Sequence, residues 1–477
     1  MQFTNNNFYI RNLQYHLSLK AGRSIKTLSV LFLYISMLGC TDFVEVNQPK
    51  NTLTSETVFQ DPATVESALA YIYSQMRDEG MVSGNFGLSA IMGIYSDELD
   101  YYQFDSNYIE YYQNTLTPSN TIVEGWWKNA YNVIYAANVI IKGVDNSIKL
   151  SLDDQKKFKG QALFVRAYLH SLLVDLYGDI PYITTPDYIK NNTVERNSVS
   201  VVYDLIIKDL IEAVQLMDSS DWSGEHVIPT KSVANALLAR MYLYTENWEM
   251  AKSTSDILIN SYNLEPDITH VFLKNSAETL WQFKPNGISN NNTYEAIQFV
   301  IQAIPGQAYA LSDGLLNAFE SDDLRATHWI DSMTSKDGLT TLQYANKYKA
   351  ILSEKSSLEY SIIFRLSEQY LIRAESLAHM GNIAGAQEDL NAIRNRAGLD
   401  NTDASNVNEL LSAILRERRV ELFTELGQRW FDLKRYGLAD ERLSPIKSNW
   451  QASDLLLPIP ETELEINPNL KPQNTGY

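Results

Sequence analysis

Two segments of this chain repeat one pattern, in which two alanines lie twelve residues apart on either side of a short polar turn. Small residues at that spacing let the two helices of a hairpin pack closely. The pattern therefore predicts two helical hairpins and constrains the chain to a mainly helical fold. The segments run from Ala239 to Ala251 around Glu246-Asn247, and from Ala374 to Ala386 around Gly381-Asn382.

Hairpins of this kind stack in tetratricopeptide repeats, and an unrelated pair of helical hairpins is the alternative. Other segments also place apolar residues at helical spacing. One of them follows Asp61-Pro62, which reads as an N-cap residue with proline at the first helical position. Another is stopped by Gly178 and Pro181. The further helices predicted in this way cover residues 61–76, 126–139, 163–176 and 203–217.

Residues 265–350 break the helical periodicity. Short apolar pieces such as 279–283 lie among Asn, Gly and Ser residues, as in 289–293. This composition predicts irregular loops with a few small strands. Near the C-terminus, closely spaced prolines predict an extended tail rather than a helix. These residues are Pro458, Pro460, Pro468 and Pro472.

The N-terminal segment has the features of a secretory signal. Basic residues, among them Lys20, Arg23 and Lys26, precede the short apolar run 28–39, which ends at Cys40, the only cysteine of the chain. A bacterial lipoprotein signal requires a cysteine at this position, because its thiol carries the lipid, although Met37 is unusual three residues before it. The run is too short for a membrane span, which needs about 20 apolar residues. An ordinary buried thiol is the other alternative.

The charge of the chain excludes some partners. The 477 residues carry a formal net charge of -19, and residues 40–477 alone carry -23. Such an acidic protein is not suited to nucleic acid or to electrostatic adhesion on anionic lipid. With Cys40 lipidated, no cysteine remains for a disulfide, so stability must come from the core, for which the chain is long enough.

The sequence carries no catalytic motif among those we considered. It lacks GxGxxG, GxxxxGK[ST], HExxH and GxSxG, and its six histidines are scattered singly. We therefore predict no catalytic residue, no cofactor and no metal site. Carboxylates cluster within 97–100 and 320–323, and a pair of them could run glycoside hydrolysis. Because acidic residues are abundant, solvated acidic faces are the favoured interpretation of both clusters.

The 29 tyrosines and 8 tryptophans suit surfaces that bind neutral amphipathic ligands, because a ring stacks while its polar tip forms hydrogen bonds. Six aromatic residues fall within twelve positions, and Gln103 and Asn107 beside them could bond sugar hydroxyls. A weaker set lies in the looped region, and core packing is the alternative for both sets. The candidate ligand-binding residues are Tyr101, Tyr102, Phe104, Tyr108, Tyr111 and Tyr112 in the first set, and Tyr294, Phe299 and Tyr309 in the second.

The C-terminal part contains the stretch RERRVELFTELGQRWFDLKR at 416–435 and the ending LPIP at 457–460 with NPNL at 467–470. Both are closely similar to the C-terminal signature of the SusD/RagB family of surface lipoproteins. The resemblance extends along most of the chain after Cys40, and it places Arg429, Trp430 and Asp432 in the scaffold rather than in the site. Further similar stretches are 166–168, 177–181, 319–325, 365–368 and 373–375.

The resemblance implies an all-α fold, with a tetratricopeptide-like helical-hairpin scaffold and an irregular, loop-rich ligand-binding half. Together with the signal, it predicts a lipoprotein signal peptide at 1–39, a lipidated tether at 40–54 and a single SusD-like domain at 55–477, loop-rich over 265–350. It implies a protein that is not an enzyme and is anchored through Cys40 in the outer membrane bilayer, facing outside.

The resemblance also implies a function and a partner. Family members bind nutrients, often oligosaccharides and sometimes peptides, and act as a lid over a TonB-dependent transporter resembling SusC. We therefore predict capture of an oligosaccharide for delivery to such a transporter. A peptide-binding member of the same family and a non-catalytic repeat adaptor are the alternatives.

Overall fold

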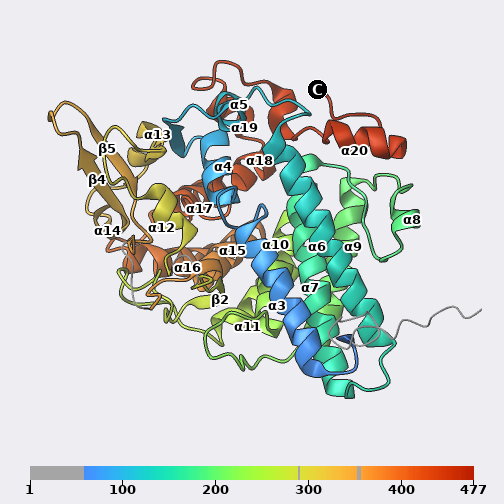
Figure 1. Ribbon diagram of the computed structural model, residues 1–477. Coiled ribbons are helices and arrows are strands. Elements are labelled where there is room, and N and C mark those ends of the chain that lie inside the picture. Colours follow the sequence, from blue (N-terminus) through green and yellow to red (C-terminus); the bar gives the residue numbers. More distant parts are fainter. Residues whose placement is uncertain (1–57, 288–290, 352–355) are drawn as a thin grey trace, which may run out of the picture. The chain divides into compact units, whose positions relative to one another are not determined.

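Capped helices build the first half of the chain in the computed structural model (Figure 1), which describes residues 58–287, 291–351 and 356–477. The predicted signal peptide, Cys40 and the tether 40–54 lie outside these residues. Asp61 is an N-cap, as predicted. Its carboxylate accepts a hydrogen bond from the Ala63 N–H at 3.0 Å, and Pro62 is the first helical residue.

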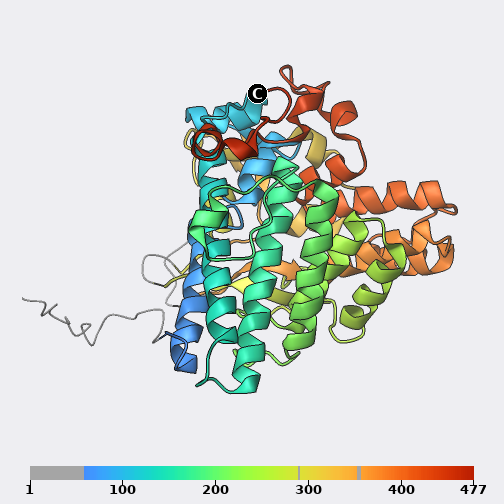
Figure 2. The same cartoon turned by 90° about the vertical axis from the view of Figure 1, so that its right-hand side faces the viewer.

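Four long helices pack side by side: α3 (Pro62–Asp78), α6 (Thr121–Asp145), α7 (Leu152–Tyr177) and α9 (Val199–Leu216). Figure 2 shows α6, α7 and α9 as neighbouring, nearly parallel rods. The helix α7 is buried along most of its length and ends at Gly178, whose φ of 75° glycine adopts without steric cost. The helices predicted from apolar spacing are therefore confirmed.

Both predicted hairpins form, and their turns have the same geometry. Glu246 and Gly381 adopt φ angles of 57° and 76°, and the following Asn247 and Asn382 cap the second helix of each hairpin. All four alanines of the pattern are fully buried, as close helix packing requires. The hairpin helices are α10 (Lys231–Tyr244) with α11 (Trp248–Ile259), and α15 (Leu366–His379) with α16 (Ile383–Arg396).

The two hairpins pack on each other through α11 and α15. The rings of Trp248 and His379 stack across this contact, with centroids 3.9 Å apart and an interplanar angle of 8°. The mainly helical fold class is thus confirmed, while the comparison with tetratricopeptide repeats stays a prediction. One hydrophobic core runs through the bundle into the looped region, and a smaller one lies under α15 and α16.

Among the described residues, strands occur only as three two-stranded antiparallel sheets, most of them within the looped region. Their strands pair β1 (Leu99–Tyr101) with β3 (Tyr309–Leu311), β2 (Thr279–Phe283) with β6 (Ser361–Arg365), and β4 (Ile330–Thr334) with β5 (Thr341–Ala345). Further helices complete the fold, and the longest of them, α17, packs against α15 and α16. They are α4 (Leu88–Tyr95), α5 (Ser106–Gln113), α8 (Tyr188–Asn191), α12 (Tyr294–Phe299), α13 (Asp313–Leu316), α14 (Leu324–His328), α17 (Val407–Glu421), α18 (Gln428–Arg435) and α19 (Ala439–Leu443).

The prediction of an extended C-terminal tail is wrong in part. A short helix, α20 (Glu461–Ile466), forms between Pro460 and Pro468, flanked by the 3-10 turns η1 (Ala452–Leu455) and η2 (Pro468–Leu470). The prolines border α20 rather than interrupt it. Proline is tolerated at a helix start because the N–H groups there have no intrahelical partner.

A buried ionic cluster joins the looped region to the hairpins. Glu421, at the end of α17, accepts hydrogen bonds from Arg365 at 2.6 Å, from Arg325 at 3.1 Å and from Arg396. Burial alone would raise the pKa of Glu421, but these three guanidinium groups hold it well below its usual range. Arg365 also pairs with Glu278, at 2.9 Å. The carboxylate therefore stays ionised in the interior.

We predict that Glu421→Gln lowers the free energy of unfolding by about 3 kcal/mol or more, because three buried cations lose their shared counter-charge. Urea denaturation checks this value. The matched control is Glu320→Gln, which removes a carboxylate that is 56% exposed and pairs with Arg394 at 2.6 Å. The control should cost less than about 1 kcal/mol. Equal losses in the two variants would contradict the special role of Glu421.

The matched turns give a second prediction. Glu246 is an exposed side chain at positive φ, so Glu246→Gly should raise the free energy of unfolding by about 0.5–1 kcal/mol. Gly381→Ala should lower it by about 1 kcal/mol. A Cβ at position 381 would meet no atom within 4 Å, so the loss comes from the backbone alone. Denaturation midpoints of both variants check the opposite signs.

Candidate functional site

The pairing of β1 with β3 brings together aromatic residues that are far apart in the sequence. Tyr101 lies opposite Tyr309 in the strand register, and their ring centroids are 5.7 Å apart. Tyr108, from α5, stacks on Tyr101: the two ring centroids lie 5.5 Å apart at an interplanar angle of 11°. Three of the nine predicted residues, from both sets, therefore form one group.

These three rings line a cavity of about 590 Å³, here called the aromatic cavity. Phe86, which the sequence analysis missed, adds a fourth ring 6.2 Å from that of Tyr108. It precedes α4 and lay outside both aromatic-rich segments, so composition gave no signal for it. Side-chain amides provide most of the polar lining: Asn85, Gln103, Gln298, Gln302 and Gln307.

Hydrogen bonds to main-chain carbonyls hold the rim of the aromatic cavity in place. The Tyr108 hydroxyl donates to the Asn85 carbonyl at 3.1 Å. The Gln298 amide donates to Gly84 at 2.9 Å, and that of Gln103 donates to Gln307. A rim fixed in this way does not need to be ordered when a ligand enters, which favours binding.

The aromatic cavity carries little charge. Asp105 is the single ionisable acid or base among its lining residues apart from the tyrosines, and it is occupied in capping α5 at the Asn107 N–H, at 2.9 Å. Burial raises the pKa of Tyr108 to about 12, so its hydroxyl is neutral at physiological pH. Neutral rings beside amides suit a ligand that has apolar faces and many hydroxyl groups.

Two of the predicted residues are corrected by the structure. Tyr111 is fully buried, with its ring 5.7 Å from those of Tyr95 and Trp126, because it lies on the face of α5 that points into the core. Phe299 is also buried and packs behind Tyr309, at 5.9 Å. Neither side chain lines the aromatic cavity.

The other four predicted residues lie apart from this group. Tyr102 follows Tyr101 in extended backbone, and its side chain is 38% exposed. The Tyr112 hydroxyl donates to Asp100 at 3.0 Å, and Lys447 lies over its ring. Tyr294 lines a separate cavity of about 200 Å³. Phe104 is 93% exposed. The predicted sets therefore do not form one continuous surface.

The prediction that both carboxylate clusters are solvated faces is wrong in part, because Asp97, Glu98 and Asp323 are buried. Two of these three carboxylates are engaged in ion pairs. Asp97 binds Arg429 at 2.7 Å and Arg419 at 2.8 Å, and Asp323 binds Arg325 at 2.9 Å. None of these residues lines the aromatic cavity. Arg429 is itself nearly buried, in keeping with its predicted place in the scaffold.

Glu98 is a buried carboxylate directly before β1. One of its oxygens accepts from the Thr424 N–H at 3.3 Å, and the other has no hydrogen-bonding partner among the described residues. Burial, with Asp97 adding to it, raises the pKa of Glu98 to about 7. Its main-chain carbonyl accepts from Ser312, at 2.9 Å, so it sits where β1 meets the segment after β3.

Comparisons with known proteins identify the family. Residues 42–243 match a family model described as "Starch-binding associating with outer membrane", and residues 324–477 match the model of the SusD family. SusD-like protein P2 of Formosa agariphila is 28% identical, covering 94% of this chain and 99% of that protein. The chain belongs to the SusD/RagB family, as the sequence predicted.

Solved structures share the fold. A crystal structure of a SusD superfamily protein from Bacteroides vulgatus matches with a TM-score of 0.80 at 22% identity, covering 88% of this chain and 100% of that one. A laminarin-binding SusD-like protein matches with a TM-score of 0.73 at 23% identity, covering 87% of this chain and 99% of that one. Within the described residues, no helix is both long and apolar enough to cross a membrane.

The raised pKa of Glu98 predicts a pH dependence of stability. The folded protein binds this proton up to about pH 7, whereas the unfolded chain releases it near 4.5. The folded state is therefore favoured as pH falls from 7 towards 5, and this contribution is lost as pH rises through 7. Glu98→Gln should remove that part of the dependence, with a gain over wild type at pH 8 of up to about 3 kcal/mol. Urea denaturation of both proteins at pH 5 and pH 8 checks it, and parallel pH profiles would contradict it.

Proposed function

We propose that this protein captures a glycan in the aromatic cavity and is a non-catalytic binding protein of the outer membrane. The observation that carries the proposal is the group of Tyr101, Tyr108 and Tyr309 with Phe86 beside a rim of neutral amides. Sugar rings present C–H faces that stack on aromatic rings, and amides both donate to and accept from hydroxyl groups. The laminarin-binding relative supports the ligand class.

The size and charge of the cavity fit this ligand class. Its volume of about 590 Å³ falls within the range of small-molecule sites. A retaining or inverting glycosidase needs two carboxyl groups that flank the scissile bond. Asp105 provides the single carboxyl group among the residues that line the aromatic cavity. The proposal is therefore binding without turnover.

The proposal extends to where the protein acts. A signal peptide at 1–39 would direct export, and a lipid on Cys40 would anchor the chain to the outer membrane through a tether at 40–54. The anchored part would be a single domain, 55–477, which is loop-rich over 265–350. The family description, which places such proteins at that membrane, supports the location. From there the protein would deliver its oligosaccharide to a TonB-dependent transporter resembling SusC.

A glycan array that includes laminarin and starch, followed by titration calorimetry on residues 41–477, tests the proposal. Tyr101→Ala with Tyr108→Ala should weaken binding of the best glycan about tenfold or more, because two stacking rings are lost. The control is Tyr71→Ala, which removes a tyrosine that is 60% exposed on α3 and does not line the cavity. Circular dichroism confirms that each variant is folded.

Three other outcomes would count against the proposal. Equal affinity in the double variant and the wild type would place the glycan elsewhere. Binding to peptides but to no glycan would support the peptide-binding alternative. Release of reducing sugar during the titration would indicate an enzyme.

A further inference from the structure

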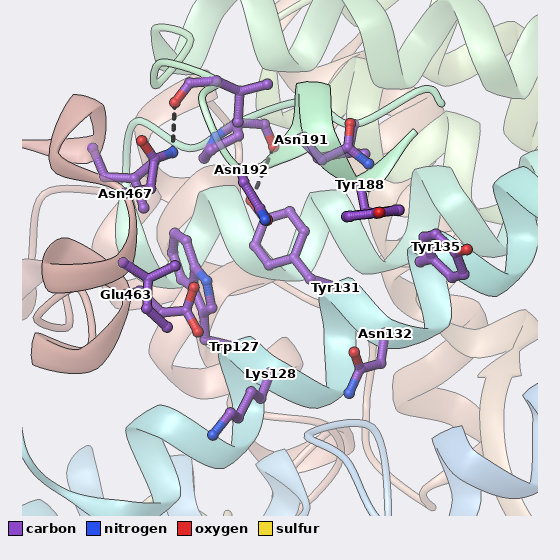
Figure 3. A pocket seen from close by; sticks show the side chains of 15 residues that line it. Trp127, Lys128, Tyr131, Asn132, Tyr135, Tyr188, Asn191, Asn192, Glu463 and Asn467 are labelled. Atoms are coloured by element: carbon purple, nitrogen blue, oxygen red, sulfur yellow. Dashed lines mark hydrogen bonds between the residues drawn. The ribbon is translucent and has the colours of Figure 1, made fainter. Parts of the chain in front are cut away.

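A second cavity, here called the α6 cavity, lies between α6, the segment around α8 and the C-terminal residues around α20. Its volume is about 240 Å³, and it shares no lining residue with the aromatic cavity. Figure 3 shows side chains from these three segments facing one another, with Glu463 and Asn467 on one side and Tyr135 and Tyr188 on the other. The α6 cavity is thus a separate place where a ligand could be held.

Aromatic side chains form one wall of the α6 cavity. Trp127, Tyr131 and Tyr135 recur every four residues along α6 and therefore share one face of the helix. Tyr188 of α8 adds a fourth ring. Two of these rings are unusually open for their size, since Tyr135 is 43% exposed and Tyr188 is 66% exposed. Rings left open beside a cavity offer stacking surfaces that the protein itself does not use.

The segments around the α6 cavity are held together by side chains that bind the main chain. Asn191 donates to the Thr185 carbonyl at 2.8 Å, and Asn467 donates to the Val194 carbonyl at 2.8 Å. The Tyr131 hydroxyl donates to Pro181 at 2.9 Å. The segment that carries α8 is therefore tied to α6 on one side and to the C-terminal tail on the other. A cavity built in this way exists before its ligand arrives.

Two further amide side chains do not form such hydrogen bonds to the main chain. The side chains of Asn132 and Asn192 line the α6 cavity and have no hydrogen-bonding partner within the part of the chain that the structure describes. Each offers two donors and one acceptor group. Hydroxyl groups, which both donate and accept, match this supply better than ions do.

The charges around the α6 cavity nearly balance. Burial raises the pKa of the Glu463 carboxyl, and Lys128 opposes that shift. Lys128 itself pairs with Glu124, at 3.0 Å. Glu463 and Lys128 are the acid and the base among the lining residues, so a bound phosphate would face a carboxylate and a bound ammonium group would face a lysine. Neither a strong anion nor a strong cation is therefore favoured.

We propose that the α6 cavity binds one ring of a neutral saccharide, stacked between Tyr135 and Tyr188 and hydrogen-bonded by Asn132 and Asn192. The volume of about 240 Å³ is below that of most drug-sized ligand sites, and it admits a single ring rather than an extended chain. The inference rests on the proposed function for its ligand class alone. It gives the protein a second contact point for a long glycan. A glycan that occupies both cavities would bind with a higher overall affinity than one that occupies either cavity alone.

The test uses single-ring probes, the methyl glycosides of glucose, galactose, mannose and xylose, in saturation-transfer NMR on residues 41–477. The starting protein carries Tyr101→Ala and Tyr108→Ala, so that the aromatic cavity is silent. We expect at least one glycoside to give a signal with this protein. The signal should fall about fivefold or more when Tyr135→Ala and Tyr188→Ala are added, and it should persist when Tyr71→Ala is added instead.

A second pair of substitutions tests hydrogen bonding without changing the shape of the α6 cavity. Asn132→Asp with Asn192→Asp keeps the size of both side chains but removes their donors, and it should also lower the signal. The proposal is overturned if no glycoside binds the starting protein, or if the signal survives loss of both tyrosines. It is also overturned if glycine betaine gives a stronger signal that Glu463→Gln abolishes, because the α6 cavity would then be a cation site.

Failure of this inference is distinguishable from failure of the proposed function. The proposed function fails when oligosaccharide affinity is equal in wild type and in the Tyr101→Ala, Tyr108→Ala variant. The inference fails on the single-ring probes in that same variant, whatever the oligosaccharide result is. The two readouts come from different residues and different ligands, so each can fail alone.

Discussion

The buried carboxylate of Glu421 is the interaction on which the arrangement of the looped region depends. It lies at the end of α17 and binds three arginines, from α14, from the junction of β6 with α15, and from α16. These contacts join α14 and β6 to the hairpin scaffold, in addition to the buried apolar residues that β6 and α16 contribute to the cores. A charge this deep is costly unless it is fully paired, and the three arginines together keep Glu421 ionised.

The aromatic cavity is connected to the same corner of the fold. Thr424, three residues after Glu421, donates to Glu98, whose main chain in turn binds Ser312. Those two contacts flank the β1–β3 pair that places Tyr101 opposite Tyr309. Lys347 reinforces the corner by donating to the carbonyls of Glu421 and Phe423, at 2.9 and 2.8 Å. The strand pair that places Tyr101 and Tyr309 in the aromatic cavity is therefore held by buried hydrogen bonds as well as by ring packing.

The sequence predicted the helices well because their signals are local. Asp61 before Pro62, and an asparagine after each hairpin turn, are caps that act within three residues. The site was predicted less well because it depends on distant pairing. Nothing near Tyr101 in the sequence indicates that Tyr309 lies across from it. Nor could periodicity assign the faces of α5, since tyrosine occurs on both: Tyr108 faces the cavity and Tyr111 the core.

In both cavities, some of the lining amide side chains bind the main chain and others have no protein partner among the described residues. In the aromatic cavity Gln298 holds the rim, while Gln302 has no partner among the described residues and faces outward. In the α6 cavity Asn191 and Asn467 hold the wall, while Asn192 is left open. The first group removes the ordering cost of binding, and the second, which is exposed to solvent, supplies donors and acceptors that a ligand can take over from water. Such a division needs little charge, which suits the neutral, hydroxyl-rich ligand proposed for both.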